Sequence, residues 1–246
     1  MRALALMFIA ATCFAAEANQ PFEWRGSVSP GLAVEIRGLN GDVHAVASDS
    51  NQVEVYAHIK SETGEPQQVR VRVVQHDHGL TFCAVSPSNK SGDCSVIPGL
   101  AGAEARVDFT VHVPRGVGLI GRTVNGEVDA RDLTGDVNAE TVNGRIQIST
   151  SGKAAAKTVN GSIIAVMKDQ CATHAAQLST VNGDITIQVP SIADTSFRAE
   201  TVHGAITSEF AKLHGGSHHV NNRTGHGSRA INLKTVNGSI QVRKAG

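Results

Sequence analysis

Apolar and polar residues alternate along much of this chain, and one short motif carries the alternation repeatedly. Thr-Val-Asn-Gly, followed after one variable residue by Val or Ile, recurs along the second half, once as Thr-Val-His-Gly. Aligned on its glycine, the wider pattern apolar-x-Gly-x-Val/Ile has eight copies. An alternation of period 2 is typical of β-strands, so the repeat predicts strands. The eight repeat glycines are Gly41, Gly126, Gly135, Gly144, Gly161, Gly183, Gly204 and Gly238.

The Asn-Gly pair within the motif raises the question of a hairpin. Asn-Gly between apolar runs is usually the strongest signal for a two-residue β-hairpin. In a hairpin the residue before Asn would face the residue after Gly, which would place Val142 beside Arg145. The residue after the glycine is polar in nearly every copy. We therefore expect the chain to run straight on, with Gly as a bend or point of close approach, and with Val, Gly and Ile on one dry face.

The spacing of the copies predicts how they stack. Val124, Leu133 and Val142 follow one another at nine residues, and a degenerate copy between Thr150 and Ala156 precedes Val159. A period of about 17 to 22 residues made of two strand-turn halves is typical of a β-solenoid rung. Each half has only two or three inward side chains, so neighbouring rungs must supply the core, at about 1.5–3 kcal/mol for each buried Val or Ile.

The predicted fold is therefore all-β. We expect a β-solenoid of stacked units of about nine residues over residues 121–246, and looser β-strands over residues 19–120. The long interval between Val202 and Val236 predicts an insertion or an irregular rung. Residues 19–246 would together form one elongated domain.

The first 18 residues predict export. Met1-Arg2 supplies one positive charge, an apolar run follows, and residues 16–18 (Ala-Glu-Ala) fit a signal-peptide cleavage site, so we expect maturation near Asn19. An alternative reading makes Cys13 a lipidated cysteine. No later stretch is long and apolar enough to span a bilayer. We expect a periplasmic or cell-surface protein that does not span the membrane.

Charge and composition limit the classes of partner and of catalytic site that the chain is expected to have. Lys and Arg number 22, Asp and Glu number 22, and aromatic residues make up 4% of the chain. These values give neither an electrostatic nor a stacking reason to expect nucleic acid. The zincin, nucleophile-elbow and P-loop motifs are missing from the sequence, as is the calcium-solenoid repeat. We therefore assign no catalytic, cofactor-binding or metal-ligating residue.

The cysteines suggest one disulfide. Cys83 and Cys94 bracket a polar loop and are able to close it in an oxidising compartment. Such a bond would stabilise the fold by about 2–3 kcal/mol. Cys171 is then left over, and we expect it to be a small buried hydrophobe.

Two clusters offer alternatives to a purely structural reading. The stretch 214–226 carries His214, His218, His219 and His226, a density at which imidazoles bind Zn²⁺, Cu²⁺ or Ni²⁺. Its glycines favour a solvated loop instead. Asp129, Asp132 and Asp136 are close enough in sequence for a β-helix enzyme that cleaves polysaccharides, although basic residues nearby favour a solvated face of mixed charge.

Two columns of polar residues accompany the repeat. The Asn column invites a ligand-binding reading, but Asn also tolerates turns and bonds to stacked copies of itself. The Thr column is reminiscent of flat ice-binding solenoids, but it lacks a second Thr two residues further on. A single Thr column is equally well explained by the preference of Thr for β-strands.

The chain resembles the bacterial putative-adhesin domain, a family of unknown function related to the head-GIN and toast-rack domains. The residues that carry the resemblance are LNGDV, VDFTVHVP, the TVNGxI repeats and the closing GHGSRAINLKTVNGSIQVR. The resemblance implies an exported, β-solenoid-like protein of the cell envelope without an established enzymatic activity. We therefore expect an adhesin or scaffold that presents a surface to an envelope glycan, an envelope protein or another copy of itself. The alternative is a β-helix-type carbohydrate-active enzyme.

Overall fold

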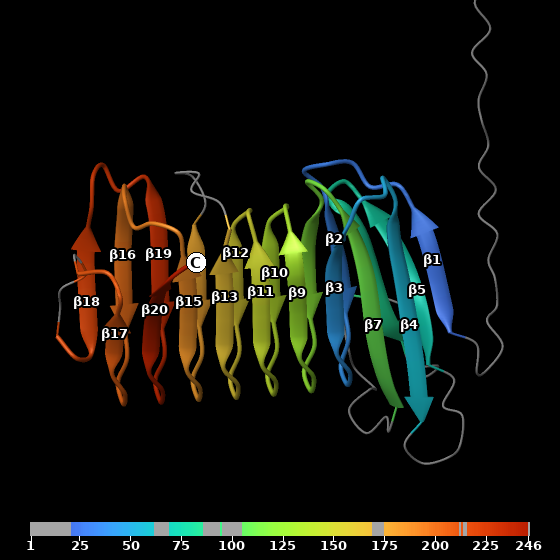
Figure 1. Ribbon diagram of the computed structural model, residues 1–246. Helices are drawn as coiled ribbons and strands as arrows, with labels where there is room; N and C mark the ends of the chain where they lie inside the picture. Colours follow the sequence, from blue (N-terminus) through green and yellow to red (C-terminus); the bar gives the residue numbers. More distant parts are fainter. Residues whose placement is uncertain are drawn as a thin grey trace, which may run out of the picture.

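The computed structural model describes residues 21–61, 69–85, 94, 105–168, 175–211, 213 and 216–245. These residues form twenty β-strands and no helix, and the strands lie in two ten-stranded sheets (Figure 1). The all-β prediction is confirmed. Because the described part contains no helix, it also contains none long and apolar enough to cross a membrane. The signal-peptide prediction, Cys171 and His214 lie outside the described residues.

We call the two sheets sheet A and sheet B. Sheet A has the order β1 (Phe22–Gly26), β4 (Val53–Ser61), β7 (Ala105–Pro114), β3 (Val43–Ser48), β9 (Val128–Leu133), β11 (Ile146–Thr150), β13 (Ile163–Met167), β15 (Ile185–Val189), β20 (Ile240–Lys244) and β17 (Ile206–Ser208). Sheet B has the order β18 (His219–Arg223), β16 (Thr195–Glu200), β19 (Arg229–Lys234), β14 (Ala176–Ser179), β12 (Ala154–Lys157), β10 (Val137–Glu140), β8 (Gly118–Arg122), β2 (Ala33–Arg37), β6 (Gly79–Val85) and β5 (Arg70–His76).

The chain passes from sheet B to sheet A at each copy of the motif. The strand β10 precedes residues 141–144 (TVNG) and lies in sheet B, whereas β11 follows them and lies in sheet A. The strands on either side of Asn-Gly therefore do not pair with each other, and the rejection of a hairpin was correct. The expectation that the chain runs straight on was wrong, because it bends across into the other sheet. We call one sheet B strand, its turn and the following sheet A strand a rung.

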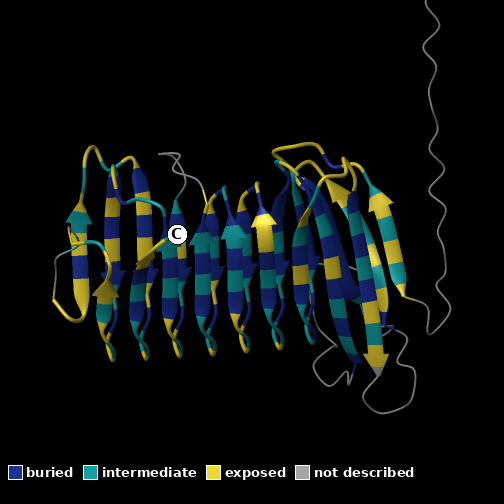
Figure 2. Ribbon diagram, in the orientation of Figure 1, coloured by how far each residue is buried: buried dark blue, intermediate teal, exposed yellow. Residues whose placement is uncertain are grey.

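Successive rungs stack in parallel and in register, which builds the core between the sheets. In sheet A, Ile146 pairs with Ile163, Ile163 with Ile185, and Ile185 with Ile240. All four are fully buried. Each contributes about 1.5–3 kcal/mol relative to an exposed side chain. Figure 2 shows the resulting alternation of buried and less buried positions along the strands.

The turns between the sheets correct one prediction about side-chain direction. The Thr of each motif is buried, whereas Val142, Val181 and Val202 are 38%, 39% and 56% exposed. The expected dry face of Val, Gly and Ile is therefore wrong at these positions. Thr points inward because its hydroxyl finds a carbonyl there, and the bend then turns the next residue outward. A buried Thr column cannot form the exposed Thr face that ice binding would use.

The glycine and the threonine of each motif contact the same atom of the neighbouring rung. A Cβ added to Gly161 would lie 1.9 Å from the carbonyl oxygen of Gly144. Thr158 Oγ1 donates to that same oxygen at 3.1 Å. The same pair of contacts recurs from rung to rung. The glycine therefore allows the close approach, and the threonine satisfies a carbonyl that would otherwise be buried without a donor.

Both ends of the stack depart from simple chain order. At one end, the rung β2–β3 lies between β6–β7 and β8–β9. At the other end, the last rung, β19–β20, lies between β14–β15 and β16–β17. The long interval after Val202 contains β17, β18 and β19, and β18 pairs antiparallel with β16. An irregular rung is therefore present where the sequence predicted one.

The close approach of the glycines makes a strong prediction for Gly161→Ala. The new methyl group would overlap a backbone oxygen that no rotamer change can move, so we expect a loss of about 3 kcal/mol in the free energy of unfolding. Gly216→Ala is the matched control, since its nearest heavy atom would lie 3.9 Å away; we expect a change within about 0.5 kcal/mol. Urea denaturation measures both, and equal stability of the two variants would contradict the prediction.

Candidate functional site

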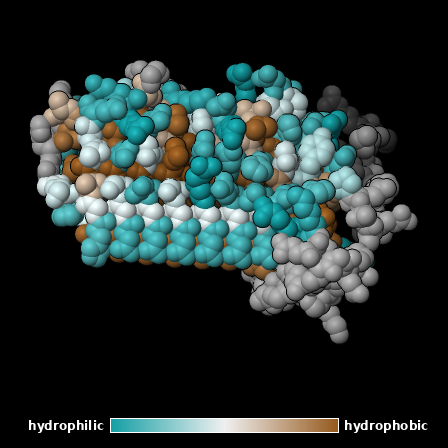
Figure 3. All heavy atoms as spheres, turned by 60° about the horizontal axis from the view of Figure 1, so that its bottom comes forward, coloured by the Kyte–Doolittle hydropathy of each residue, from teal (hydrophilic) through white to brown (hydrophobic). Residues whose placement is uncertain are grey.

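The TVNG turns line up along one edge of the molecule, at the bottom of Figure 1. Figure 3 brings this edge forward and shows a straight hydrophilic row bordered by a hydrophobic one. We call it the Val–Asn edge. Its polar row is Asn40, Asn125, Asn143, Asn160, Asn182, Asn237 and His203, in spatial order. Its apolar row is made by the residue that precedes each of these, namely Leu39, Val124, Val142, Val159, Val181, Val236 and Val202.

The side chains of the polar row form an unbroken hydrogen-bonded ladder. Asn160 Nδ2 donates to Asn143 Oδ1 at 2.8 Å, and Asn182 Nδ2 donates to Asn160 Oδ1 at 2.8 Å. The other Asn pairs have distances of 2.7 to 2.8 Å, and His203 Nδ1 lies 3.1 Å from Asn237 Oδ1 at the end of the row. The prediction that each Asn bonds to its stacked copy is confirmed.

The ladder leaves hydrogen-bonding capacity facing solvent. An Asn amide has two N–H donors and an oxygen with two lone pairs. Asn143 and Asn160 each use one donor and one lone pair within the ladder, and both side chains are exposed. Each therefore presents a second N–H and a second lone pair outward, at the strand spacing of about 4.8 Å.

The dimensions of the Val–Asn edge limit what it is able to bind. Seven rungs at about 4.8 Å span about 30 Å, and two side chains give a width of about 10 Å. The area is then about 300 Å², well below the roughly 800 Å² per partner of a stable protein–protein interface. The edge suits a narrow, extended partner better than a second globular surface.

A groove of about 640 Å³ crosses the outer side of sheet B. It runs over β2, β8, β10, β12 and β14, and its lining includes the small residues Gly118, Ala154 and Ala155 and the apolar side chain of Ile120. Asn138 and Gln177 lie at intervals along it. The charged residues in its lining are Asp136 and Lys153, which pair with each other at 3.7 Å. The groove has binding groups but no pair of carboxylates for acid–base catalysis.

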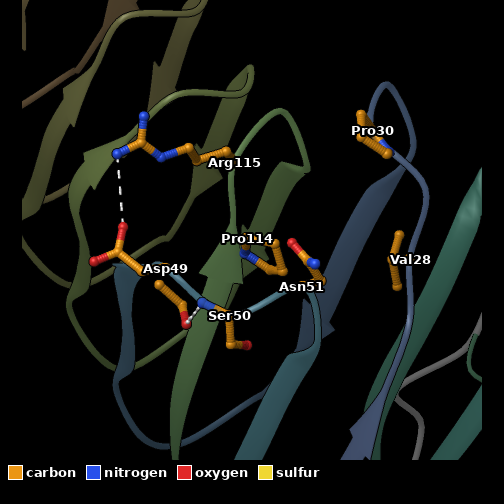
Figure 4. Close-up of a pocket in the computed structure, with 8 residues that line it drawn as sticks. Val28, Pro30, Asp49, Ser50, Asn51, Pro114 and Arg115 are labelled. Atoms are coloured by element: carbon orange, nitrogen blue, oxygen red, sulfur yellow. Dashed lines mark hydrogen bonds and ion pairs between the residues drawn. The ribbon is translucent and has the colours of Figure 1, made fainter.

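A smaller pocket of about 200 Å³ lies between the β3–β4 and β7–β8 turns. Figure 4 shows its lining, which includes Pro30, Ser50 and Pro114. The ion pair between Asp49 and Arg115, 3.6 Å apart, is almost fully exposed and contributes little to binding or stability. We assign no function to this pocket.

The structure separates the three carboxylates of the enzyme hypothesis. Asp129 pairs with Arg131 at 2.6 Å on the outer face of sheet A. Asp132 pairs with Lys168, also at 2.6 Å, and Asp136 lies on the sheet B side in the groove. The hydrogen bond from Lys168 lowers the pKa of Asp132. Each carboxylate thus forms its ion pair with a different basic residue, and the charge of Arg131 also acts on Asp132.

The histidine-rich stretch is only partly described. His218 and His219 are exposed at β18, His226 is exposed in the turn before β19, and His219 lies 3.6 Å from Glu200. Among the described residues, no group of three or more His, Cys, Asp or Glu side chains gathers as a metal site would require. The described part of the stretch therefore gives no structural support for a metal centre.

Sequence reasoning missed a buried polar cluster on sheet B. Glu35 is only 6% exposed and accepts hydrogen bonds from Arg37 and Thr81. Arg122 lies 3.6 Å from the same carboxylate. Burial raises the pKa of Glu35, but the hydrogen bonds from Arg37 and Thr81 and the charges of Arg37 and Arg122 outweigh it, so the pKa is lowered overall. No signal in the sequence pointed to this cluster, because it depends on the pairing of β2 with β6 and β8.

The cysteine pair adjoins this cluster. Cys83 and Cys94 are joined in a disulfide, with Cα atoms 5.8 Å apart. Arg37 Nη1 donates to the backbone oxygen of Cys94 at 2.9 Å. The disulfide thus fixes a backbone acceptor beside Glu35 and Arg37.

No protein-family model matches this chain, and no curated protein matches it. Several solved structures resemble it. A putative cell adhesion protein from Clostridium sporogenes is 13% identical, with a TM-score of 0.48, over 92% of this chain and 100% of that chain. A putative adhesin from Bacteroides fragilis is 14% identical, with a TM-score of 0.33, over 91% and 97% of the two chains. A putative adhesin from Parabacteroides distasonis is 10% identical, with a TM-score of 0.23, over 92% and 97%. At these identities and TM-scores we draw no functional conclusion from the likeness.

The ladder predicts a pH-dependent effect of Asn160→Asp. An ionised carboxylate has no N–H for Asn143 Oδ1, so we expect a loss of about 1–2 kcal/mol in unfolding free energy at neutral pH. A protonated Asp restores a donor, so its pKa in the folded state is raised above the unfolded value of about 3.9. The loss should therefore vanish below that pH and grow as the pH rises through the folded-state pKa. Urea denaturation against pH measures it. Asn232→Asp, on an exposed position outside the ladder, should show no such dependence.

The buried cluster predicts a second pH effect, of opposite sign. Because the pKa of Glu35 is lowered from 4.5, its ionised form stabilises the fold above the unfolded pKa, and this contribution is lost as the pH falls through the folded-state pKa. We expect Glu35→Gln to cost about 2 kcal/mol at neutral pH and to reduce the loss of stability in acid. Glu127→Gln, whose ion pair with Arg145 is exposed, is the control. An unchanged acid slope in Glu35→Gln would contradict the assignment.

Proposed function

We propose that this chain is an exported, non-enzymatic protein of the cell envelope that acts as an adhesin or scaffold. In this proposal the stacked rungs serve as a β-solenoid scaffold, and the Val–Asn edge binds an extended envelope glycan. The observation that carries the proposal is the unbroken Asn ladder beside a row of apolar side chains, of which Val142, Val181 and Val202 are exposed and the others partly buried.

The chemistry of the Val–Asn edge matches that of a neutral polysaccharide. Sugar hydroxyls both donate and accept hydrogen bonds, as do the outward groups of Asn143 and Asn160. The C–H faces of sugar rings are apolar, and the methyl groups of Val142 and Val181 stand beside the ladder. The polar row itself consists of neutral amides and one histidine, so it offers no strong attraction to a highly charged partner.

The repetition along the edge favours a repeating partner. Each rung offers the same small set of groups, which is too weak to bind a single sugar tightly. A polymer that engages several rungs gains from the high effective concentration of each further contact. The narrow width of the edge is also the width of one extended chain. An envelope glycan therefore fits it better than a folded protein.

The enzyme hypothesis receives less support from the geometry. A glycosidase of the usual kind needs two carboxyl groups on either side of one scissile bond. Asp129, Asp132 and Asp136 are each paired with a different basic residue. We therefore propose binding without cleavage, and the release of soluble sugars in the assay below checks this part separately.

Substitutions on the apolar row test the proposal. We expect Val142→Lys with Val181→Lys to weaken co-sedimentation with envelope polysaccharide about tenfold, because both side chains are exposed and two cations would replace the apolar contact. The matched control is Ala230→Lys with Asn232→Lys, which adds the same charge at exposed positions of β19. The measurement is the bound fraction of the full chain against isolated envelope fractions and purified neutral polysaccharides.

Four outcomes are informative. Saturable binding that only the valine substitutions weaken supports the proposal. The proposal is contradicted if the valine substitutions and the β19 control substitutions weaken binding equally. It is also contradicted if the chain binds to no glycan fraction. Release of soluble sugars that Asp129→Ala or Asp136→Ala abolishes would instead support the enzyme.

A further inference from the structure

The last rung of the chain is not at the end of the stack. β19 pairs with β14 on one side and with β16 on the other, and all three strands are parallel. β20 likewise lies between β15 and β17. Residues 229–244 therefore fill a slot whose two walls, β14–β15 and β16–β17, come earlier in the chain (Figure 1).

The walls of the slot are in register with each other through the inserted rung. Ile240 pairs with Ile185 on one side and with Ile206 on the other. In sheet B, Ile231 pairs with both Ala176 and Phe197. If the rung left, the walls would meet with aliphatic and aromatic side chains opposite one another, and no strand edge inside the sheets would be left without a partner.

The turn of the inserted rung makes the same contacts as every other rung. Asn237 Nδ2 donates to Asn182 Oδ1 at 2.7 Å. Thr235 Oγ1 donates to the Gly183 carbonyl at 2.9 Å. A Cβ on Gly238 would lie 2.0 Å from that carbonyl. An identical rung from another molecule would make all of these contacts again.

The connection on the N-terminal side of the rung is short. Residues 224–228 join β18 to β19, and Gly225 and Gly227 have φ values of +55° and +67°. The carboxylate of Asp194 accepts hydrogen bonds from the backbone N–H of His226 and from Ser228 Oγ, the latter at 2.8 Å. This tight turn directs the chain back between its own walls. An extended connection would let the rung reach another molecule.

We propose that residues 229–244 exchange between copies of this chain, so that the last rung of one molecule occupies the slot of another. The partner is a second copy, because the slot selects strands that carry the Thr-x-Asn-Gly-x-Ile spacing of a rung. Exchange replaces each contact within a molecule by the same contact between molecules, which is the condition under which domain swapping is inexpensive.

Cross-linking between full-length chains tests the exchange. Thr186 and Gln241 are facing partners in β15 and β20, and a disulfide spans the distance between adjacent strands. One chain carries Thr186→Cys and the other carries Gln241→Cys, both with Cys171→Ser. The two are mixed, warmed to just below the unfolding midpoint, cooled and oxidised. We expect disulfide-linked dimers, and about tenfold more of them with Gly225→Val, because the αL turn that favours insertion within one molecule is then strained.

Two controls decide the result. A single chain with both Thr186→Cys and Gln241→Cys must cross-link internally, which establishes that the pair reacts. Asn138→Cys and Ala155→Cys in separate chains face each other across β10 and β12, two internal strands, and should give no dimer. The proposal is overturned if Thr186→Cys and Gln241→Cys in separate chains yield no dimer even with Gly225→Val. It is also overturned if Asn138→Cys and Ala155→Cys in separate chains yield as much dimer as Thr186→Cys and Gln241→Cys do.

Discussion

The structure depends on one contact, the approach of a glycine Cα to the glycine carbonyl of the next rung. At Gly161 and Gly144 the space left for a Cβ is 1.9 Å from an oxygen atom, so no other residue fits. The carbonyl in question receives its hydrogen bond from Thr158 and not from a backbone amide. Glycine and threonine are thus two halves of one contact in the rungs that carry TVNG or TVHG. This is the physical reason for the repetition in the sequence.

The same contact determines what the edge presents. Because Thr points inward and Gly has no side chain, the bend leaves only the two residues between them to face outward. These are Val and Asn, and stacking in register turns each into a straight row. The ladder of Asn amides then holds the row at a fixed spacing, since each amide is both donor and acceptor. The surface that we propose for binding is therefore fixed by the packing beneath it.

Much of the architecture could be predicted from the sequence, for reasons that are local. The period-2 pattern around Gly144 and Gly161 predicts strands, and the polar residue after each glycine excludes a hairpin. The direction of the Val before Asn could not be predicted, because Val142 and Thr141 are both good strand residues and only the Gly126 carbonyl decides which one turns inward. The Glu35 cluster depends on strands far apart in the chain, and no periodicity reports such pairings.

The position of the last rung was also beyond the sequence, and the cause is the uniformity of the rungs. A repeat whose copies make identical contacts does not specify their order, so chain order alone would place β19–β20 at the end. The rung at which the ladder ends in space is β16–β17, and His203 distinguishes it from the others. The ring of His203 bonds to Asn237 but has no amide with which to continue the ladder. A different residue at the last position is how repeat proteins close a stack. If the inserted rung left, Asn237 would no longer separate His203 from Asn182. The ring of His203 would then end the ladder at Asn182 as it now does at Asn237, so it ends the ladder with or without the inserted rung.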